Sequence, residues 1–243
     1  MNAAVKWFRQ ILFTALVLLS AAWASAEGAQ WLLRWRAERL LADIRSLEVN
    51  RSGWSDAQAE IKKWGRSGIP IGSCTSEACT YRIDLIQSLP PMLVGYPGEG
   101  VRNSLPRLMD HIGLRNAAAR GGFTVEHGVI TSKWFGEQVT LPVRDWTQPS
   151  DYVPYLSASS GENAKFRGLA GGDHTPHPHR VAQTSGSAMA VTFSPEEDPS
   201  EQTALMDFRF SCITRFTPCE NEGEILPAAW QDLQDQEQTP GTR

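Results

Sequence analysis

The first strong pattern of apolar and polar positions lies in residues 29–48. Apolar residues recur there at spacings of four and three, which places them on one face of a helix. These positions are Leu33, Ala37, Leu40, Ile44 and Leu47. Two further pairs have the i,i+4 spacing that favours ion pairing on the other side of a helix. They are Arg34 with Glu38, and Arg39 with Asp43. The pattern predicts a helix over 29–48 that ends at the Asn-Arg-Ser-Gly stretch of 50–53.

A second, shorter helix is indicated just after this stretch. Ser55 and Gln58 have the spacing of a capping box, in which two side chains bond the backbone at the start of a helix. The apolar residues that follow fall on one helical face, and they are Ala57, Ile61 and Trp64. Gly65 is placed to end the helix, because glycine readily takes the left-handed conformation of helix C-termini.

Alternation of apolar and polar residues predicts strands further along the chain. The alternation is clear in 81–85, 187–193 and 206–212. In 206–212 every second residue is apolar or cysteine, which places Cys212 at the buried edge of a strand.

Two more strands, 123–126 and 129–135, flank His127-Gly128. This dipeptide is typical of a two-residue hairpin turn, in which glycine supplies the positive φ. His127 is therefore interpreted as a turn residue, not a ligand. Gly136-Glu137 then separates the second strand from the apolar stretch 138–143.

The remaining stretches are less regular. Residues 88–107 are rich in proline and glycine and predict an irregular segment, with a short helix near 103–111. Residues 145–185 predict a long surface excursion, a kind of segment that is usually functional or disordered. A last helix is expected over 225–236, followed by a disordered tail over 237–243.

The order of these elements indicates the fold class. Strands arrive in runs with hairpin turns, and the clearest helices come first, so helices do not alternate with strands. We predict an α+β fold in which N-terminal helices pack on one face of an antiparallel, meander-type sheet. Residues 27–236 are expected to form this single domain.

Residues 1–26 have the features of an export signal. Lys6 and Arg9 form a basic start, an apolar core follows, and Ala24-Ser25-Ala26 offers the small residues that precede a cleavage site. We favour cleavage before Glu27. The alternative is an uncleaved membrane anchor over residues 7–26, whose length suits a span of about 20 residues. Both interpretations place the domain outside the cytoplasm, as a periplasmic, extracellular or membrane-anchored protein.

This location decides how the four cysteines are interpreted. Outside the cytoplasm an even number of cysteines predicts disulfides. We expect the two local pairs, because each closes a short polar loop; they are Cys74–Cys79 and Cys212–Cys219. A zinc site built from all four cysteines is the weaker alternative, since zinc sites usually use a closer Cys-x-x-Cys spacing.

Composition narrows the choice of partners. The net charge of −4 and the absence of a basic patch in the sequence argue against nucleic-acid binding. Nine tryptophans are many for 243 residues. They fit core filling and helix anchoring, or a partner-binding face.

Candidate chemistry is sparse. The sequence carries no phosphate-binding loop, dinucleotide fingerprint, His-Glu-x-x-His or Gly-x-Ser-x-Gly motif, so no cofactor is predicted. Three histidines of the 145–185 stretch form the best candidate metal site, through imidazole ligands that suit zinc, copper or nickel. They are His174, His177 and His179. The acidic run at 196–198 is interpreted as a solvated loop.

These features favour a non-catalytic envelope domain that binds another envelope protein or a polymer. Membrane contact is expected only through residues 7–26, and only if they are retained. Two alternatives remain open: a secreted hydrolase whose site is assembled from residues distant in sequence, and a metal-binding protein that uses the histidine stretch.

Overall fold

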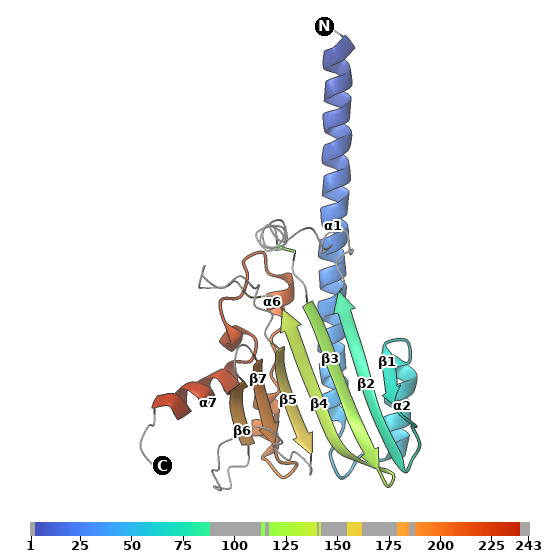
Figure 1. The fold of residues 1–243 in the computed structure, drawn as a ribbon, viewed down its shortest axis with the longest axis vertical. Coiled ribbons are helices and arrows are strands. Elements are labelled where there is room, and N and C mark those ends of the chain that lie inside the picture. Colours follow the sequence, from blue (N-terminus) through green and yellow to red (C-terminus); the bar gives the residue numbers. More distant parts are fainter. Residues whose placement is uncertain are drawn as a thin grey trace.

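The computed structural model describes residues 3–87, 113–114, 117–139, 141, 155–161, 179–184 and 188–238. Seven strands form one sheet, and most of the helices lie at the two ends of the chain (Figure 1). The helices are α1 (Ala3–Ser46), α2 (Trp54–Trp64), α5 (Pro199–Leu205), α6 (Ser211–Thr214), η1 (Glu222–Glu224) and α7 (Pro227–Gln238). The strands are β1 (Gly68–Ile71), β2 (Ala78–Gln87), β3 (Ala117–Glu126), β4 (Val129–Val139), β5 (Tyr155–Gly161), β6 (His179–Thr184) and β7 (Ala188–Phe193).

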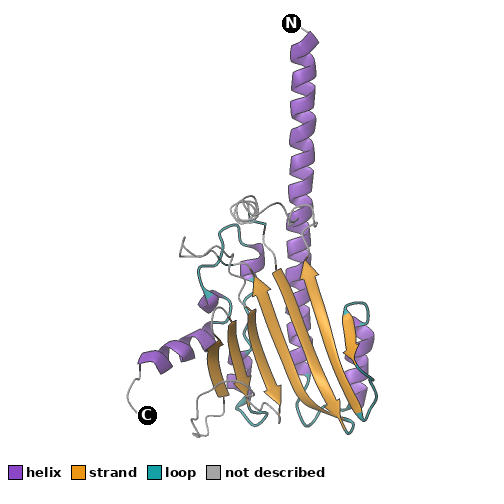
Figure 2. Ribbon diagram, viewed as in Figure 1, coloured by secondary structure: helices purple, strands orange, loops and turns teal. Residues whose placement is uncertain are grey.

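The strand order in the sheet is β1-β2-β3-β4-β5-β7-β6. The first five strands form an antiparallel meander, β7 pairs with β5 in parallel, and β6 returns antiparallel to β7. The long helix α1 lies behind the sheet in the view of Figure 2. The predicted α+β class, with an N-terminal helix on one face of a mainly antiparallel sheet, is confirmed.

The β3–β4 hairpin turns at the expected dipeptide. His127 and Gly128 both have positive φ, at 53° and 81°, which is the backbone that a two-residue turn between twisted strands requires. The His127 side chain is almost fully exposed. The interpretation of His127 as a turn residue is confirmed.

Helix α1 fixes the core through the apolar face that its periodicity predicts. All five of its predicted core positions are buried, and they are Leu33, Ala37, Leu40, Ile44 and Leu47. They pack against the inner face of β2, β3 and β4. The helix is longer than predicted, because it continues without a break from Ala3 through the leader. Its N-terminal half projects beyond the sheet (Figure 1).

The segment around α6 completes the core on the same side as α1. Phe208 and Phe210 place their rings edge-on against Phe135 of β4, with centroid distances of 4.9 Å and 5.8 Å. Such edge-to-face contacts add to the free energy gained by burial. Both predicted disulfides are formed, Cys74–Cys79 and Cys212–Cys219. Each disulfide closes a short loop, and none of the four cysteines is free.

Several local predictions are wrong, each for a physical reason. Residues 206–212 bury every second side chain but form no strand, because their backbone bonds locally and to Ile225 instead of to a neighbouring strand. Gly136 does not interrupt β4; its missing side chain makes room for the Tyr155 side chain, whose hydroxyl oxygen would lie 2.5 Å from an added Cβ. Helix α2 begins two residues earlier than predicted, because the Asp56 carboxylate accepts the Gly53 N–H at its start. At its end, Gly65 has a right-handed conformation and not the left-handed one that was predicted.

The stretch 145–185 is not only an excursion. It contains β5 and β6, which are integral strands of the sheet. The predicted C-terminal helix is confirmed as α7, and it extends through residues 237–238 of the predicted tail. The rest of the tail and the predicted short helix at 103–111 lie outside the described residues.

Candidate functional site

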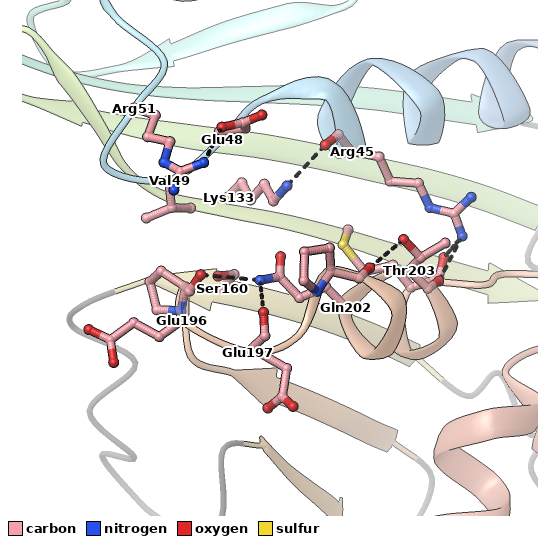
Figure 3. Close-up of a pocket in the computed structure, with 13 residues that line it drawn as sticks. Arg45, Glu48, Val49, Arg51, Lys133, Ser160, Glu196, Glu197, Gln202 and Thr203 are labelled. Carbon is pink, nitrogen blue, oxygen red and sulfur yellow. Dashed lines mark hydrogen bonds and ion pairs between the residues drawn. The ribbon is translucent and has the colours of Figure 1, made fainter.

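A pocket of about 420 Å³ lies where the end of α1 meets β4, β5 and the segment that leads into α5 (Figure 3). Its lining carries both signs of charge. The charged side chains are Arg45, Arg51 and Lys133, and Glu48, Glu196 and Glu197. A lining of this kind suits water or a small polar molecule, because an apolar ligand would leave these groups without hydrogen bonds.

Lys133 is the most deeply buried cation of the pocket, with a side chain 6% exposed. Its Nζ donates hydrogen bonds to the carbonyl oxygens of Arg45, at 3.1 Å, and Leu47, at 2.6 Å. Carbonyls at the end of a helix have no partner within the helix, so the ammonium group closes the C-terminus of α1. Burial lowers the pKa of Lys133 to about 8, and the nearby Glu48 carboxylate opposes this shift.

Ser160 lies directly opposite Lys133 in the register of β4 and β5. Its side chain is buried, and its hydroxyl has no hydrogen-bond partner among the described residues. A serine beside a lysine of lowered pKa is a possible nucleophile and base. A base must lie within hydrogen-bond reach of the serine hydroxyl, but that hydroxyl has no partner among the described residues, and the Lys133 amine donates to two carbonyls. The arrangement therefore supports a structural role for Lys133 over catalysis.

The opposite wall of the pocket is held by hydrogen bonds to the backbone. Gln202 donates through Nε2 to the carbonyls of Glu197, at 2.8 Å, and Pro195, at 3.2 Å. Arg45 donates to the carbonyl of Met206 at 2.6 Å, which ties α1 to the end of α5. These bonds position the acidic run at 196–198, only part of which is a solvated loop. Glu197 is buried, and Asp198 caps α5 by accepting the Ser200 N–H.

His179 is the only member of the predicted histidine site within the described residues, since His174 and His177 lie outside them. Its two ring nitrogens face two carboxylates. Nε2 lies 2.8 Å from Asp232 of α7, and Nδ1 lies 3.4 Å from Glu197. In Figure 3 the Glu197 carboxylate points away from Lys133, behind the wall of the pocket.

This geometry does not form a metal centre from His179. The two carboxylates lie against opposite edges of the imidazole, so one ion cannot contact the ring and both acids together. Within the part of the chain that the structure describes, no three side chains of the metal-ligating types form a group that could hold an ion. The three-histidine site stays a prediction, and His179 joins β6, the loop before α5 and α7.

Two buried polar side chains lie outside the pocket and were missed by sequence reasoning. Glu137 of β4 and Gln30 of α1 are both fully buried, and neither side chain has a hydrogen-bond partner among the described residues. Burial raises the pKa of Glu137 well above its usual range, because water no longer solvates the carboxylate. The Gly136-Glu137 pair suggested a turn, which hid this position from the sequence pattern.

The face of the sheet turned away from α1 offers a second candidate surface. Asp84 of β2 lies between two guanidinium groups, with its oxygens 3.0 Å from Arg82 Nε and 3.6 Å from Arg120 Nε. Beside this cluster, the Trp134 and Tyr155 rings lie over glycines of the neighbouring strands. Charged groups next to flat aromatic rings can bind a partner that carries both polar and apolar groups.

Sequence reasoning missed Lys133 and Ser160 as a pair, although one signal was present. Lys133 lies two residues before Phe135, so in a strand both side chains point to the buried face of the sheet. A lysine is unusual at a buried position. Ser160 gave no signal, because the strand that places it opposite Lys133 was not predicted.

Comparisons with known proteins give no relative. No protein family, no curated protein and no solved structure matches the chain. Function is therefore argued from this structure alone.

Proposed function

We propose that the chain is an exported cell-envelope protein that retains residues 7–26 as a membrane anchor and presents a non-catalytic binding domain outside the cytoplasm. The observation that carries the proposal is the exposed apolar half of α1. Residues 5–25 of the helix have no buried side chain, although most of them are apolar. Each large apolar side chain left in water costs about 1.5–3 kcal/mol relative to burial.

A bilayer would remove this cost. The helix is long and apolar enough to cross a membrane. At about 1.5 Å per residue, the 20 residues 7–26 extend about 30 Å, the thickness of the hydrocarbon core. Trp7 and Trp23 then lie near the two interfaces, where tryptophan is enriched.

A retained anchor would join the folded domain directly through α1. The helix passes through Ala24-Ser25-Ala26 without a break and reaches Gln30, the first fully buried side chain. Cleavage before Glu27 would start the remaining helix three residues before Gln30, with four backbone N–H groups that lack a partner within the helix.

Charge and sulfur chemistry support the orientation. Lys6 precedes the proposed anchor and Arg9 lies in its first turn, and basic residues favour the cytoplasmic side of a membrane. This orientation places the sheet outside, where an oxidising environment maintains both disulfides.

The two candidate surfaces support binding over catalysis. In the pocket, Lys133 donates to two backbone carbonyls, and no hydrogen bond joins it to Ser160 among the described residues. The outer sheet face, with Asp84 between two arginines and two flat rings beside it, fits a polar partner such as an envelope polymer or another envelope protein.

Alkaline carbonate extraction combined with external protease tests the proposal. The full chain, tagged at its C-terminus, is expected to stay in the membrane pellet, and protease added outside the cytoplasmic membrane should remove the tag. Recovery of the folded chain in the soluble envelope fraction would contradict the anchor. Protection of the tag from external protease would contradict the orientation.

A further inference from the structure

A group of exposed apolar side chains continues beyond the proposed anchor onto the folded domain. Three of them follow one another on α1: Trp31 is 57% exposed, Leu32 is 55% and Trp35 is 54%. The fourth is Phe216, at 63%, just after α6. These four residues are called the interface surface below. Exposed apolar side chains of this size, when several occur in one region, mark an interaction surface.

The position of the tryptophans on α1 shows which way the surface points. Trp31, Trp35 and Arg39 follow at i, i+4 and i+8, on the side of the helix opposite the buried Leu33 and Leu40. They therefore face away from the sheet. Helical side chains also lean toward the N-terminus of their helix, which directs these rings back toward the proposed anchor.

The distances from the anchor place Trp31 at the outer edge of the interfacial layer of a bilayer and Trp35 beyond it. Trp31 and Trp35 follow Ala26 by five and nine residues, which corresponds to about 8 Å and about 14 Å along the helix. The headgroup layer is about 5–8 Å thick on each side of the hydrocarbon core. A helix tilt of about 20° toward this face brings the second ring closer to the layer.

An arginine lies beside each ring. Arg34 is held by the Glu38 carboxylate and the Thr214 hydroxyl, and Arg39 has the chemistry of a headgroup contact. The Arg34 guanidinium lies 5.4 Å from the Trp31 ring centroid, and that of Arg39 lies 5.5 Å from the Trp35 ring centroid. Indole rings favour the membrane–water boundary, and guanidinium groups bind phosphate through paired N–H donors. Arg39 is exposed on the same stripe as the two rings.

Phe216 lies close to the part of α1 that follows the anchor. Gly113 lies between Phe216 and Glu27. A Cβ added to Gly113 would be 3.2 Å from the Phe216 ring and 3.4 Å from the Glu27 carboxylate. Phe216 is therefore a neighbour of the first turn of α1 after the anchor. Two interactions hold the loop that carries Phe216. The Cys212–Cys219 disulfide closes it, and Arg34 donates to the Thr214 hydroxyl at 3.0 Å.

We propose that Trp31, Leu32, Trp35 and Phe216 rest on the headgroup layer of the bilayer that the anchor crosses, and so hold the domain against the membrane. This inference rests on the proposed function, and it adds a second membrane contact to residues 7–26. The outer sheet face then has a fixed orientation relative to the membrane.

The test uses the full chain labelled with 5-fluorotryptophan, one copy per lipid nanodisc, with a nitroxide on the lipid headgroup. Single Trp→Phe variants assign the fluorine signals. Trp31 and Trp35 are expected to broaden to a similar extent as Trp23, while Trp230 of α7 stays sharp. One copy per disc means that a second chain cannot cover the surface.

The outcomes separate the two proposals. Trp31 and Trp35 follow the anchor on the same helix, so the F216W variant carries the decision: a fluorine signal at this position that stays sharp while Trp23 broadens would overturn the interface surface and leave the anchor intact. Absence of broadening at Trp23 would overturn the anchor itself. Broadening of Trp230 to the same extent would also contradict the surface, because it would indicate contact without a preferred face.

A second measurement follows Phe216 with the variant F216W, whose new fluorine signal should broaden. Trp31→Gln together with Trp35→Gln is expected to reduce that broadening at least twofold, since the domain loses its support on the headgroups. The matched control replaces the exposed Ile69 and Ile71 of β1 by glutamine and should change nothing. Equal effects of the two double variants would contradict the surface.

Discussion

Residues 5–25 and residues 30–46 lie on one uninterrupted helix, yet their apolar side chains have opposite surroundings. The second stretch is amphipathic: one stripe is buried against the sheet, and the other sides carry most of its charges. The first stretch carries apolar side chains on every side, and all of its side chains are exposed. An all-round apolar surface indicates a lipid environment, whereas a stripe indicates a protein core.

The comparison implies that one helix contributes to two separate equilibria. The first half should govern membrane insertion, and the second half should govern folding of the domain. Substitutions in one half are then expected to leave the other equilibrium nearly unchanged. The first two predictions below test this separation, and the other two test the disulfides and Lys133; their expected effects decrease in this order.

The largest effect is expected from Leu16→Arg combined with Leu18→Arg, in the middle of the apolar half. Each arginine costs about 2.5–3.5 kcal/mol at the centre of a membrane helix, so the pair costs about 5–7 kcal/mol. The variant should leave the membrane pellet, and its cysteines should stay reduced and react with maleimide. Leu16→Ala with Leu18→Ala is the control and should behave as wild type. Normal membrane retention of the arginine variant would contradict the anchor.

Leu40→Ala, in the buried half, is expected to lower the free energy of unfolding by about 2–5 kcal/mol, because Leu40 is completely buried against the sheet. Leu32→Ala makes the same change on the exposed side of the helix and should cost less than about 0.5 kcal/mol. Denaturant titration of the solubilised full chain, followed by near-ultraviolet circular dichroism, measures both. Similar losses of unfolding free energy for the two variants would show that Leu40 does not lie on the buried side of the helix.

Replacing Cys212 and Cys219 by serine is expected to cost about 2.5 kcal/mol, because the reduced chain gains the freedom that the closed loop removes. The same denaturant titration measures the loss. The control replaces Cys74 and Cys79, which close a slightly shorter loop and should cost about 2 kcal/mol. Only the first pair holds the loop of Phe216, so only its loss should reduce the fluorine broadening at F216W. No change in stability for either variant would contradict a role for the disulfides as staples.

Lys133 should give the stability a distinct dependence on pH. Burial lowers its pKa from 10.5 to about 8 in the folded chain. Between these values the unfolded chain binds a proton that the folded chain does not, so stability rises with pH across this window. The rise from pH 8 to pH 10 amounts to about 2 kcal/mol relative to Lys133→Met. Parallel pH profiles of the two proteins would contradict the shift.

The sequence was sufficient for the parts of the fold that local physics determines. The stripe from Leu33 to Leu47 requires only helical periodicity, and the turn at His127-Gly128 requires only positive φ. Both disulfides were predicted from the export signal and the short loops between the cysteines. In each case the decisive contacts are close in sequence or share one period.

The parts that were missed depend on contacts between distant segments. Strand β5, with its small polar residues at 157–160, becomes a strand because β4 and β7 pair with its two edges. Residues 206–212 alternate like a strand but have no neighbouring strand to bond. The pairing of Lys133 with Ser160 follows from the β4–β5 register, which no local pattern encodes.

The most direct measurement is the intact mass of the chain recovered from the membrane fraction without reductant. We predict a mass that includes residues 1–26 and is four hydrogens lighter than that of the fully reduced chain, because two disulfides are formed. A chain that begins at Glu27 and is recovered in the soluble fraction would contradict the division of α1 into an anchor and a core helix.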